Sequence, residues 1–210
     1  MLTININSLK NALLKPLPGE NIQLQMAPST RPNININSLK ITDYKQSAVM
    51  VVLCRDETDT FFIPLIERET YNGTHSGQIS LPGGKFDIED LNLETTARRE
   101  CFEEIGLQNI EVLGKLTQVY IPVSGFLVQP YLGYCTATNL TFVKHQREVK
   151  TILKLNIKTL IDDTIIKNGS VTNDVNLKHP YFEANNYKIW GATAMILNEV
   201  KVLLKKCTTL

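Results

Sequence analysis

The residues best suited to chemistry in this 210-residue sequence are three glutamates, Glu100, Glu103 and Glu104, within five positions of one predicted helix. At about 100° per residue, Glu104 lies between Leu93 and Ala97, so the carboxylates border the face that packs. Carboxylates beside an apolar wall raise one another's pKa and destabilise the fold unless a cation neutralises them. Carboxylate oxygens are ligands that Mg²⁺ prefers, and the neighbouring sequence lacks the cysteine and histidine spacing typical of zinc. The cluster predicts a divalent-cation site, with a charged surface turn as the alternative.

A glycine pair just before this helix supplies a second part of the site. The stretch "LPGGK" (81–85) places Gly83 and Gly84 in a turn, where the missing Cβ lets the backbone approach a ligand. Such a turn can offer a carbonyl oxygen to a metal ion or amide groups to a phosphate. Residues 85–107 carry seven acidic and three basic side chains, a local charge of −4 in a chain whose formal net charge is +1. A cluster of acidic residues therefore follows the glycine turn in the sequence.

The elements that must position these groups can be read from hydrophobic spacing. Apolar residues recur every four positions from Leu93 to Ile105, and Gly106 is a typical helix stop, so a helix is predicted over 93–105. The Gly-, Ser- and Asp-rich residues before it, 69–90, predict a long loop. Strands are predicted over 47–55, 61–68, 111–120, 126–135 and 149–156.

A second helix is predicted over residues 191–206, where Leu197, Val200 and Leu204 form one stripe. Strands and helices in this order predict an α+β (mixed α/β) fold. At the other end, residues 4–15 show helical spacing and are closed by "KPLPG", so a short amphipathic helix followed by an extended lead-in is expected over 1–43. The main domain is then expected over 44–210.

Composition excludes several classes of protein. A formal net charge of +1 and a pI near 7.6 disfavour a protein that lives on nucleic acid or on anionic lipid. The longest apolar run has seven residues, Ala48 to Cys54, which is too short to span a membrane. The four cysteines have no CxxC spacing and lie in or beside apolar runs, which indicates free thiols and a cytoplasmic protein.

The stretch 84–107 resembles the Nudix hydrolase box, G-x5-E-x7-R-E-U-x-E-E-x-G-U, in which U is aliphatic. Gly84 matches the first glycine, and "RECFEEIGL" (99–107) matches the end of the box. Asp90 stands where the first glutamate is expected, and the spacer that follows it has eight residues rather than seven. The resemblance implies an α/β/α sandwich with a central mixed sheet and the box helix packed on it.

Residues 65–85, "LIERETYNGTHSGQISLPGGK", are similar to the signature that precedes the box in the coenzyme A pyrophosphatase branch of this family. Arg68, Gly77 and residues 82–84 fall in register. Gly73 replaces a second arginine, and Leu81 replaces a phenylalanine. This narrower resemblance implies hydrolysis of coenzyme A or acyl-coenzyme A to 4′-phosphopantetheine, or its acyl form, and adenosine 3′,5′-bisphosphate.

The family resemblance also implies roles for individual residues. Mg²⁺ or Mn²⁺ would be bound by Glu100, Glu103 and Glu104 with help from the Gly83 carbonyl, and Arg99 would orient the glutamates. The general base would be Glu103 or Glu104.

Further candidates come from the surrounding sequence. Arg68, Gly84 and Lys85 are expected at the substrate, with bracing of the box helix as the alternative role for Arg68. Asp90 and Glu148 are weaker candidates, with surface exposure as the alternative for Glu148 as a base. Ser124 could line a pocket or only form a turn.

Other functions stay open at this point. Nucleotide sugars, dinucleoside polyphosphates and oxidised nucleotides present the same linkage, and a non-catalytic nucleotide-binding sensor is a different class of protein. RNA decapping is disfavoured because no basic, aromatic-rich stretch is present to hold RNA. The expected partner is a small nucleotide-derived pyrophosphate, with no nucleic acid and no membrane, and a homodimer is possible because it is common among relatives.

Overall fold

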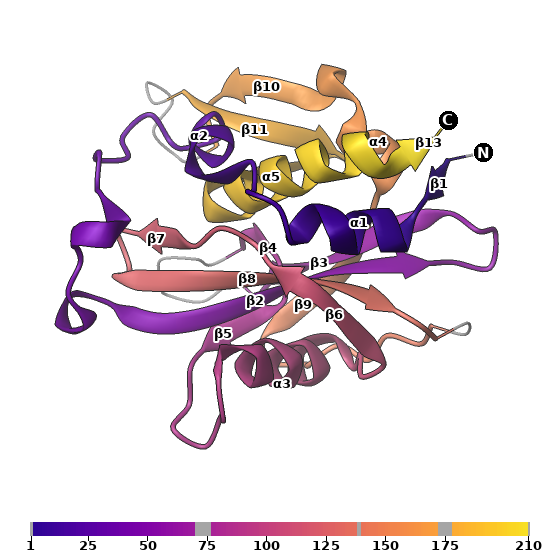
Figure 1. The fold of residues 1–210 in the computed structure, drawn as a ribbon, viewed down its shortest axis with the longest axis horizontal. Coiled ribbons are helices and arrows are strands. Elements are labelled where there is room, and N and C mark those ends of the chain that lie inside the picture. The colour runs from indigo at the N-terminus through magenta and orange to yellow at the C-terminus, as the bar shows by residue number, and fades with distance from the viewer. Residues whose placement is uncertain (1, 70–76, 138–139, 172–177, 210) are drawn as a thin grey trace.

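A computed structural model describes residues 2–69, 77–137, 140–171 and 178–209, and its centre is one mixed β-sheet (Figure 1). β2 runs parallel to β8 and antiparallel to β3 and β5, while β6 and β7 pair with β8, and β4 and β9 pair with β3. The strands are β2 (Lys45–Arg55), β3 (Phe61–Arg68), β4 (Ile79–Ser80), β5 (Gly83–Lys85), β6 (Ile110–Lys115), β7 (Val119–Ile121), β8 (Phe126–Cys135) and β9 (Val149–Asn156).

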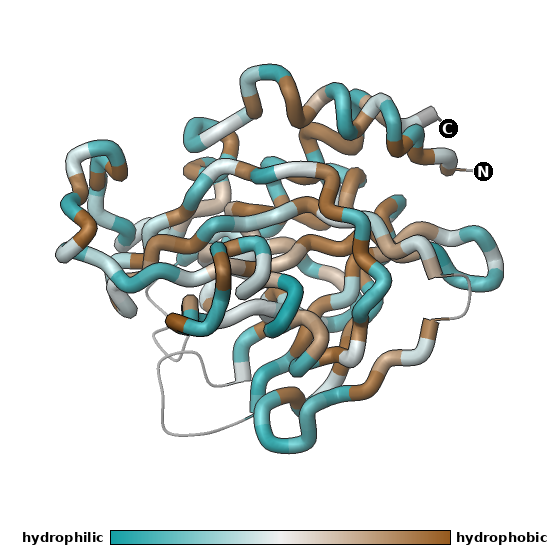
Figure 2. The backbone as a smooth tube through the Cα atoms, turned by 60° about the horizontal axis from the view of Figure 1, so that its bottom comes forward, coloured by the Kyte–Doolittle hydropathy of each residue, from teal (hydrophilic) through white to brown (hydrophobic). Residues whose placement is uncertain are grey.

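Helices cover both faces of this sheet because β2 alternates between two cores. Met50 and Val52 pack with Ala97 of α3 (Leu93–Ile105) on one face. Val51 and Leu53 belong to the other core, which includes α5 (Gly191–Cys207). Figure 1 shows α3 below the sheet and α1, α2 and α5 above it. In Figure 2, apolar residues recur along the central strands, whereas several peripheral loops are polar. The predicted α/β/α sandwich is confirmed.

The N-terminal segment differs from its prediction after the first helix. α1 (Ile6–Leu13) forms as expected, and β1 (Thr3–Ile4) pairs with β13 (Thr208–Thr209). In place of an extended lead-in the chain forms α2 (Gly19–Leu24) and short 3₁₀ turns at Ile36–Ser38 and Ile41–Asp43.

A tertiary contact accounts for α2. The carboxylate of Glu199, fully buried in α5, accepts hydrogen bonds from Gly19 N (3.1 Å) and Gln23 Nε2 (3.0 Å). It also accepts from Thr117 N (3.1 Å) and Thr117 Oγ1 (2.6 Å). A buried carboxylate needs such donors, and the local sequence of α2 gives no sign that Glu199 will meet it.

A small antiparallel sheet near the C-terminus is absent from the sequence-based assignment. It follows α4 (Ile157–Ile161) and a 3₁₀ turn at Asp163–Ile165, and it consists of β10 (Ile166–Gly169), β11 (His179–Ala184) and β12 (Tyr187–Trp190). Asn185 and Asn186 join β11 to β12 with φ of 52° and 66°, as a tight hairpin turn requires. This hairpin brings His179 and Trp190 together, and their rings stack with centroids 5.9 Å apart.

The structure also bears on the cysteines and on membrane-spanning helices. All four cysteines are free thiols, three of them buried. Among the residues that the structure describes, no helix has both the length and the apolar character needed to cross a membrane.

Candidate active site

The box helix α3 has defined ends that fix the positions of its glutamates. At its start, Asn92 Oδ1 accepts a hydrogen bond from Thr95 N (3.0 Å), a typical N-cap. At its end, Gly106 adopts a left-handed φ of 74° and donates to Phe102 O (2.8 Å). Ala97, Cys101 and Ile105 anchor the helix against the sheet, which leaves the glutamates at the edge of the buried face.

Glu104 is the most buried of the three glutamates, with 1% of its surface exposed. Its Oε2 accepts a hydrogen bond from Gly83 N (2.8 Å), and its Oε1 lies 3.4 Å from Arg68 Nη2. The same Arg68 nitrogen donates to Gly83 O (3.2 Å). Burial raises the pKa of Glu104 to about 7, although Arg68 and the Gly83 amide favour its charged form. Arg68 thus braces the helix against the glycine turn and also lines the adjoining cavity.

The two glycines of the turn are required by close packing. Gly83 has a φ of 155°, and a Cβ there would lie 2.4 Å from Ala48 O. A Cβ on Gly84 would lie 2.3 Å from the carboxyl carbon of Glu100. Side chains at these positions would therefore collide with β2 and with the box helix.

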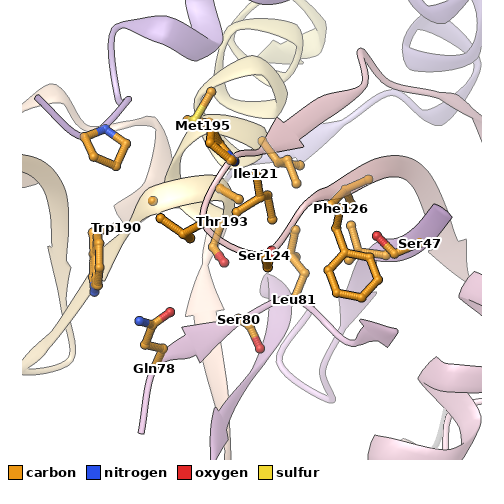
Figure 3. Close-up of a pocket in the computed structure, with 18 of the residues that line it drawn as sticks. Ser47, Gln78, Ser80, Leu81, Ile121, Ser124, Phe126, Trp190, Thr193 and Met195 are labelled. Atoms are coloured by element: carbon orange, nitrogen blue, oxygen red, sulfur yellow. The ribbon is translucent and has the colours of Figure 1, made fainter. Parts of the chain in front are cut away.

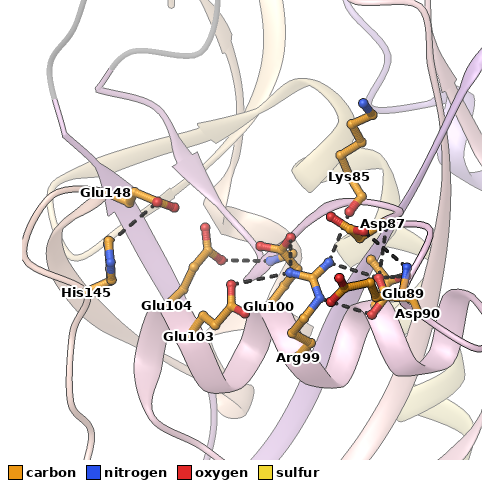
Figure 4. A network of polar contacts seen from close by, with 12 residues as sticks. Lys85, Asp87, Glu89, Asp90, Arg99, Glu100, Glu103, Glu104, His145 and Glu148 are labelled. Atoms are coloured by element: carbon orange, nitrogen blue, oxygen red, sulfur yellow. Dashed lines mark hydrogen bonds and ion pairs between the residues drawn. The ribbon is translucent and has the colours of Figure 1, made fainter.

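Arg99 is the centre of a polar network that holds the other acidic residues (Figure 4). Its Nε and Nη2 donate to the two carboxylate oxygens of Asp90 at 3.0 and 2.9 Å. Its Nη1 donates to Glu100 (2.9 Å) and to Glu103 (3.3 Å), and its Nη2 also donates to Lys85 O (3.2 Å). The hydrogen bonds from Arg99 lower the pKa of Asp90 to about 2, and those to Asp90 raise the pKa of Arg99. Burial raises the pKa of Glu100.

Asp90 is therefore placed as a partner of Arg99. Besides the two bonds from Arg99, its carboxylate accepts from Thr96 Oγ1 (2.8 Å) and Asp87 N (3.1 Å). Asp90 is 7% exposed, and these four donors account for its carboxylate oxygens. The geometry favours a role in positioning Arg99 over direct contact with a ligand.

Glu148 lies across from the box helix, near its C-terminal half (Figure 4). Its side chain is 57% exposed and pairs with His145 Nδ1 at 3.7 Å. The backbone N of His145 donates to Glu104 O (3.0 Å), which ties this loop to the helix. Negative charge on Glu148 contributes to the raised pKa values of Glu100 and Glu104. The structure thus brings Glu148 beside the glutamate cluster.

The side chains of the site offer the type of ligand atom, carboxylate oxygen, that a hard divalent cation prefers. The carboxylates of Glu100, Glu103 and Glu104 are oxygen ligands, and burial raises the pKa of Glu100 and Glu104 despite their contacts with Arg99 and Arg68. Within the described ranges, however, no three Asp, Glu, His or Cys side chains are grouped closely enough to enclose an ion. Glu100 and Glu103 are turned to Arg99 instead. Arg99 bonds one oxygen of each carboxylate, so the second oxygen of Glu100 and of Glu103 can still face a cation.

A cavity of about 560 Å³ adjoins the glycine turn. Arg68, Gly83, Gly84 and Lys85 contribute to its lining. Figure 3 shows Trp190 and Met195 on one side of the cavity, Phe126 and Ser47 on the other, and Ser124 between them. Ser124 Oγ is buried and makes no hydrogen bond within the described part of the chain. Ser124 lies in a turn and also lines the cavity.

Some residues of the cavity carry no local signal in the sequence. Arg31 and His179 line it, but they come from segments far from the box. Only the pairing of distant segments brings them there. Gly73 and His75, which fall in the predicted loop before the box, lie outside the described residues.

An α/β/α sandwich with a glutamate-bearing helix against a Gly-Gly turn is the architecture of a Nudix-type hydrolase. The family described as "NUDIX domain" matches residues 44–159, and the chain belongs to this family. It is a hydrolase of a pyrophosphate-bearing substrate.

Similar proteins agree with this assignment. The chain is 29% identical over 185 residues to an uncharacterized Nudix hydrolase, NudL, of Pectobacterium atrosepticum, covering 85% of this chain and 88% of that one. NudL of Yersinia pestis is 26% identical over 182 residues, with the same coverage.

Two solved structures share the fold. A MutT/nudix family protein from Enterococcus faecalis has a TM-score of 0.51 at 17% identity, covering 81% of this chain, and this chain spans 63% of its length. The Nudix hydrolase RenU from M. smegmatis has a TM-score of 0.50 at 13% identity, covering 84% and 96% of the two chains.

The raised pKa of Glu104 predicts an unusual dependence of stability on pH. Its ordinary pKa is 4.5 and its folded value is about 7, so the folded state binds more protons between these values. The free energy of unfolding therefore falls as the pH rises through this window, by about 3 kcal/mol in total. Urea unfolding at pH 5 and pH 8 in EDTA should show Glu104→Gln gaining about this much relative to wild type at the higher pH.

A control on the same helix separates this effect from general titration. Glu94 pairs with Arg98 at 3.0 Å on the exposed side of the first turn. Glu94→Gln should keep a constant stability difference from wild type between pH 5 and pH 8. A constant difference for Glu104→Gln as well would mean that Glu104 titrates near its ordinary value, contrary to the expectation.

Proposed function

We propose that this protein hydrolyses the pyrophosphate linkage of coenzyme A or acyl-coenzyme A in the presence of Mg²⁺ or Mn²⁺. The observation that carries the proposal is the cavity that opens beside Gly83, Gly84 and Lys85. Its lining includes three basic residues and no Asp or Glu within the described ranges, and the remainder is largely apolar. Such a cavity suits a substrate with an anionic end and a long, weakly polar arm.

The signature before the box supports coenzyme A over other pyrophosphates. Arg68 and residues 82–84 of that signature meet in space, because Arg68 donates to Gly83 O and lies 3.4 Å from Glu104. Apolar side chains on both sides of the cavity, Trp190 and Met195 facing Phe126, offer room for a pantetheine or acyl arm (Figure 3).

In the proposed reaction, the oxygen of water forms a bond to one phosphorus and the bridging phosphorus–oxygen bond breaks. The products are 4′-phosphopantetheine, or its acyl form, and adenosine 3′,5′-bisphosphate. Glu103 or Glu104 accepts the proton of the attacking water. Glu104 is buried beside the glycine turn, and Glu103 is the more exposed of the two.

Other side chains hold these groups in place. Arg99 fixes Glu100 and Glu103 through charge-assisted hydrogen bonds, and Asp90 fixes Arg99 in turn. Lys85 and the backbone of Gly84 face the substrate's phosphates. Glu100, Glu103 and Glu104 would hold the cation, which supplies charge neutralisation at the diphosphate and a more acidic water.

A substrate panel tests the proposal. Coenzyme A, acetyl-coenzyme A, a nucleotide sugar, a dinucleoside polyphosphate and an oxidised nucleotide are each incubated with the protein and Mg²⁺ or Mn²⁺, and the products are separated by mass. We expect 4′-phosphopantetheine and adenosine 3′,5′-bisphosphate from coenzyme A. Glu103→Gln protein purified in parallel controls for contaminating phosphatases. Cleavage of a nucleotide sugar with coenzyme A left intact would refute the assignment.

A further inference from the structure

Arg31 is a basic residue of the cavity that the proposed reaction does not use. The other basic residues of the lining are Arg68 and Lys85. Arg68 is occupied by Glu104 and Gly83 O, and Lys85 belongs to the glycine turn beside the diphosphate site. Arg31 comes from the segment between α2 and the first 3₁₀ turn, outside the part of the chain that matches the Nudix family.

Two hydrogen bonds, one at Ser29 and one at Arg31, fix the segment that carries Arg31 against the cavity. Ser29 N donates to His179 Nδ1 (3.2 Å), which joins the segment to the stacked rings of His179 and Trp190. Arg31 Nη1 donates to Tyr120 O in β7 (2.5 Å), and Arg31 N donates to Pro28 O (2.9 Å). The guanidinium is therefore held by one backbone carbonyl in β7, and the bond to Pro28 O shapes the turn that carries it.

The charge of Arg31 has no direct counter-ion in the described part of the chain. No carboxylate lies within ion-pair distance there, and Glu20 acts on Arg31 only through longer-range attraction. Burial lowers the pKa of Arg31, yet a guanidinium remains protonated at neutral pH. Because the bond to Tyr120 O uses only one of its N–H groups, the remaining donors suit an anion with several oxygens.

The order of the strands gives the distance between Lys85, beside the diphosphate site, and Tyr120, the partner of Arg31. Lys85 in β5 pairs with Ser47 in β2. Ser47 pairs with Val128 in β8, which pairs with Val119 in β7. Three steps of about 4.8 Å between neighbouring strands put the region of Tyr120 about 14 Å from Lys85. This backbone separation exceeds the reach of one side chain, so Lys85 and Arg31 can contact two different phosphate groups of one bound substrate.

We infer that Arg31 binds a second phosphate group of the substrate, a phosphate monoester on the ribose, and thereby determines specificity. The inference rests on the proposed function, since coenzyme A carries such a phosphate at the ribose 3′ position. A bidentate or charge-assisted contact with this phosphate holds the nucleoside end while the diphosphate lies at the glutamates.

Coenzyme A and 3′-dephospho-coenzyme A provide the test, because they differ only in this phosphate. Wild type should show a kcat/KM for coenzyme A at least about tenfold above that for the dephospho compound. Arg31→Gln should lower kcat/KM for coenzyme A by about ten- to hundredfold and leave the dephospho compound unchanged, so that the ratio approaches one. Unchanged turnover of the dephospho compound shows that the variant is folded. Arg31→Lys keeps the positive charge but loses the paired N–H donors of the guanidinium, so it should retain part of the preference for coenzyme A over the dephospho compound.

Arg55→Gln is the matched control. Arg55 is an exposed residue at the far end of β2, eight positions from Ser47 or about 26 Å, where it pairs with Asp59. Its substitution should leave both substrates unaffected.

The other outcomes separate a failure of the inference from a failure of the proposed function. Equal cleavage of both compounds by wild type, or a preference that survives in Arg31→Gln, overturns the inference while the proposed function stands. If neither compound is cleaved, the coenzyme A assignment fails, and NADPH with NADH poses the same question on another pyrophosphate. Loss of an NADPH preference in Arg31→Gln would support the inference, and failure of all four compounds overturns it with the proposed function.

Discussion

Glu103→Gln and Glu104→Gln are each expected to lower kcat/KM by about 10²- to 10⁴-fold while the fold stays intact. Glutamine keeps the size of the side chain and removes its negative charge and its capacity to accept a proton. At position 104, the amide oxygen can still accept the hydrogen bond from Gly83 N, so the contact that fixes the glycine turn survives. At position 103, half of the side chain is exposed, and only the 3.3 Å contact with Arg99 is weakened.

The measurement is steady-state kinetics with coenzyme A at saturating Mg²⁺, together with circular dichroism and thermal unfolding. Glu94→Gln makes the same chemical change on the exposed side of the first turn of α3, and it should keep full activity. Full activity in both site variants would show that the glutamates are not needed for turnover. That result would favour a nucleotide-binding sensor over an enzyme.

The sequence predicts the box helix and central strands well because their signals are local. Asn92 and Gly106 mark the ends of α3 through the hydrogen-bonding and conformational preferences of single residues. The buried runs of β2 and β8 are long enough to identify strands, although periodicity does not say that these two lie parallel. Glu100, Glu103 and Glu104 share a helix, so their proximity follows from helical spacing alone.

The remainder of the site depends on contacts between distant segments. Arg68 meets Glu104, and Arg31 meets Tyr120 O, only after the sheet has formed. Single-sequence patterns hold no information on such pairs, and α2 was missed for the same reason, since its partner Glu199 lies in α5. The turn at Asn185 and Asn186 did carry a local signal, because asparagine tolerates positive φ more readily than most residues.

Removal of divalent cations is expected to abolish hydrolysis, by about 10³-fold or more, without unfolding the protein. Glu100 and Glu104 have raised pKa values because they are buried, and Glu103 and Glu148 add negative charge around Glu100. Arg99 and Arg68 hold this cluster together in the metal-free protein, so chelation should leave the secondary structure unchanged. Dialysis against EDTA followed by assay with coenzyme A, and by titration with Mg²⁺ or Mn²⁺, measures the effect.

Thermal unfolding supplies an independent reading of the same cation. Binding to the folded state alone stabilises it by about 2.7 kcal/mol at a cation concentration one hundred times Kd, so Mg²⁺ or Mn²⁺ should raise the Tm of wild type. Because the cation must displace a proton from Glu104, this rise should shrink as the pH falls below about 7. Glu94→Gln should show the full rise, and Glu103→Gln a reduced one. Undiminished activity in EDTA, or an equal rise in Glu103→Gln and wild type, would mean that the acidic turn of α3 does not bind the cation.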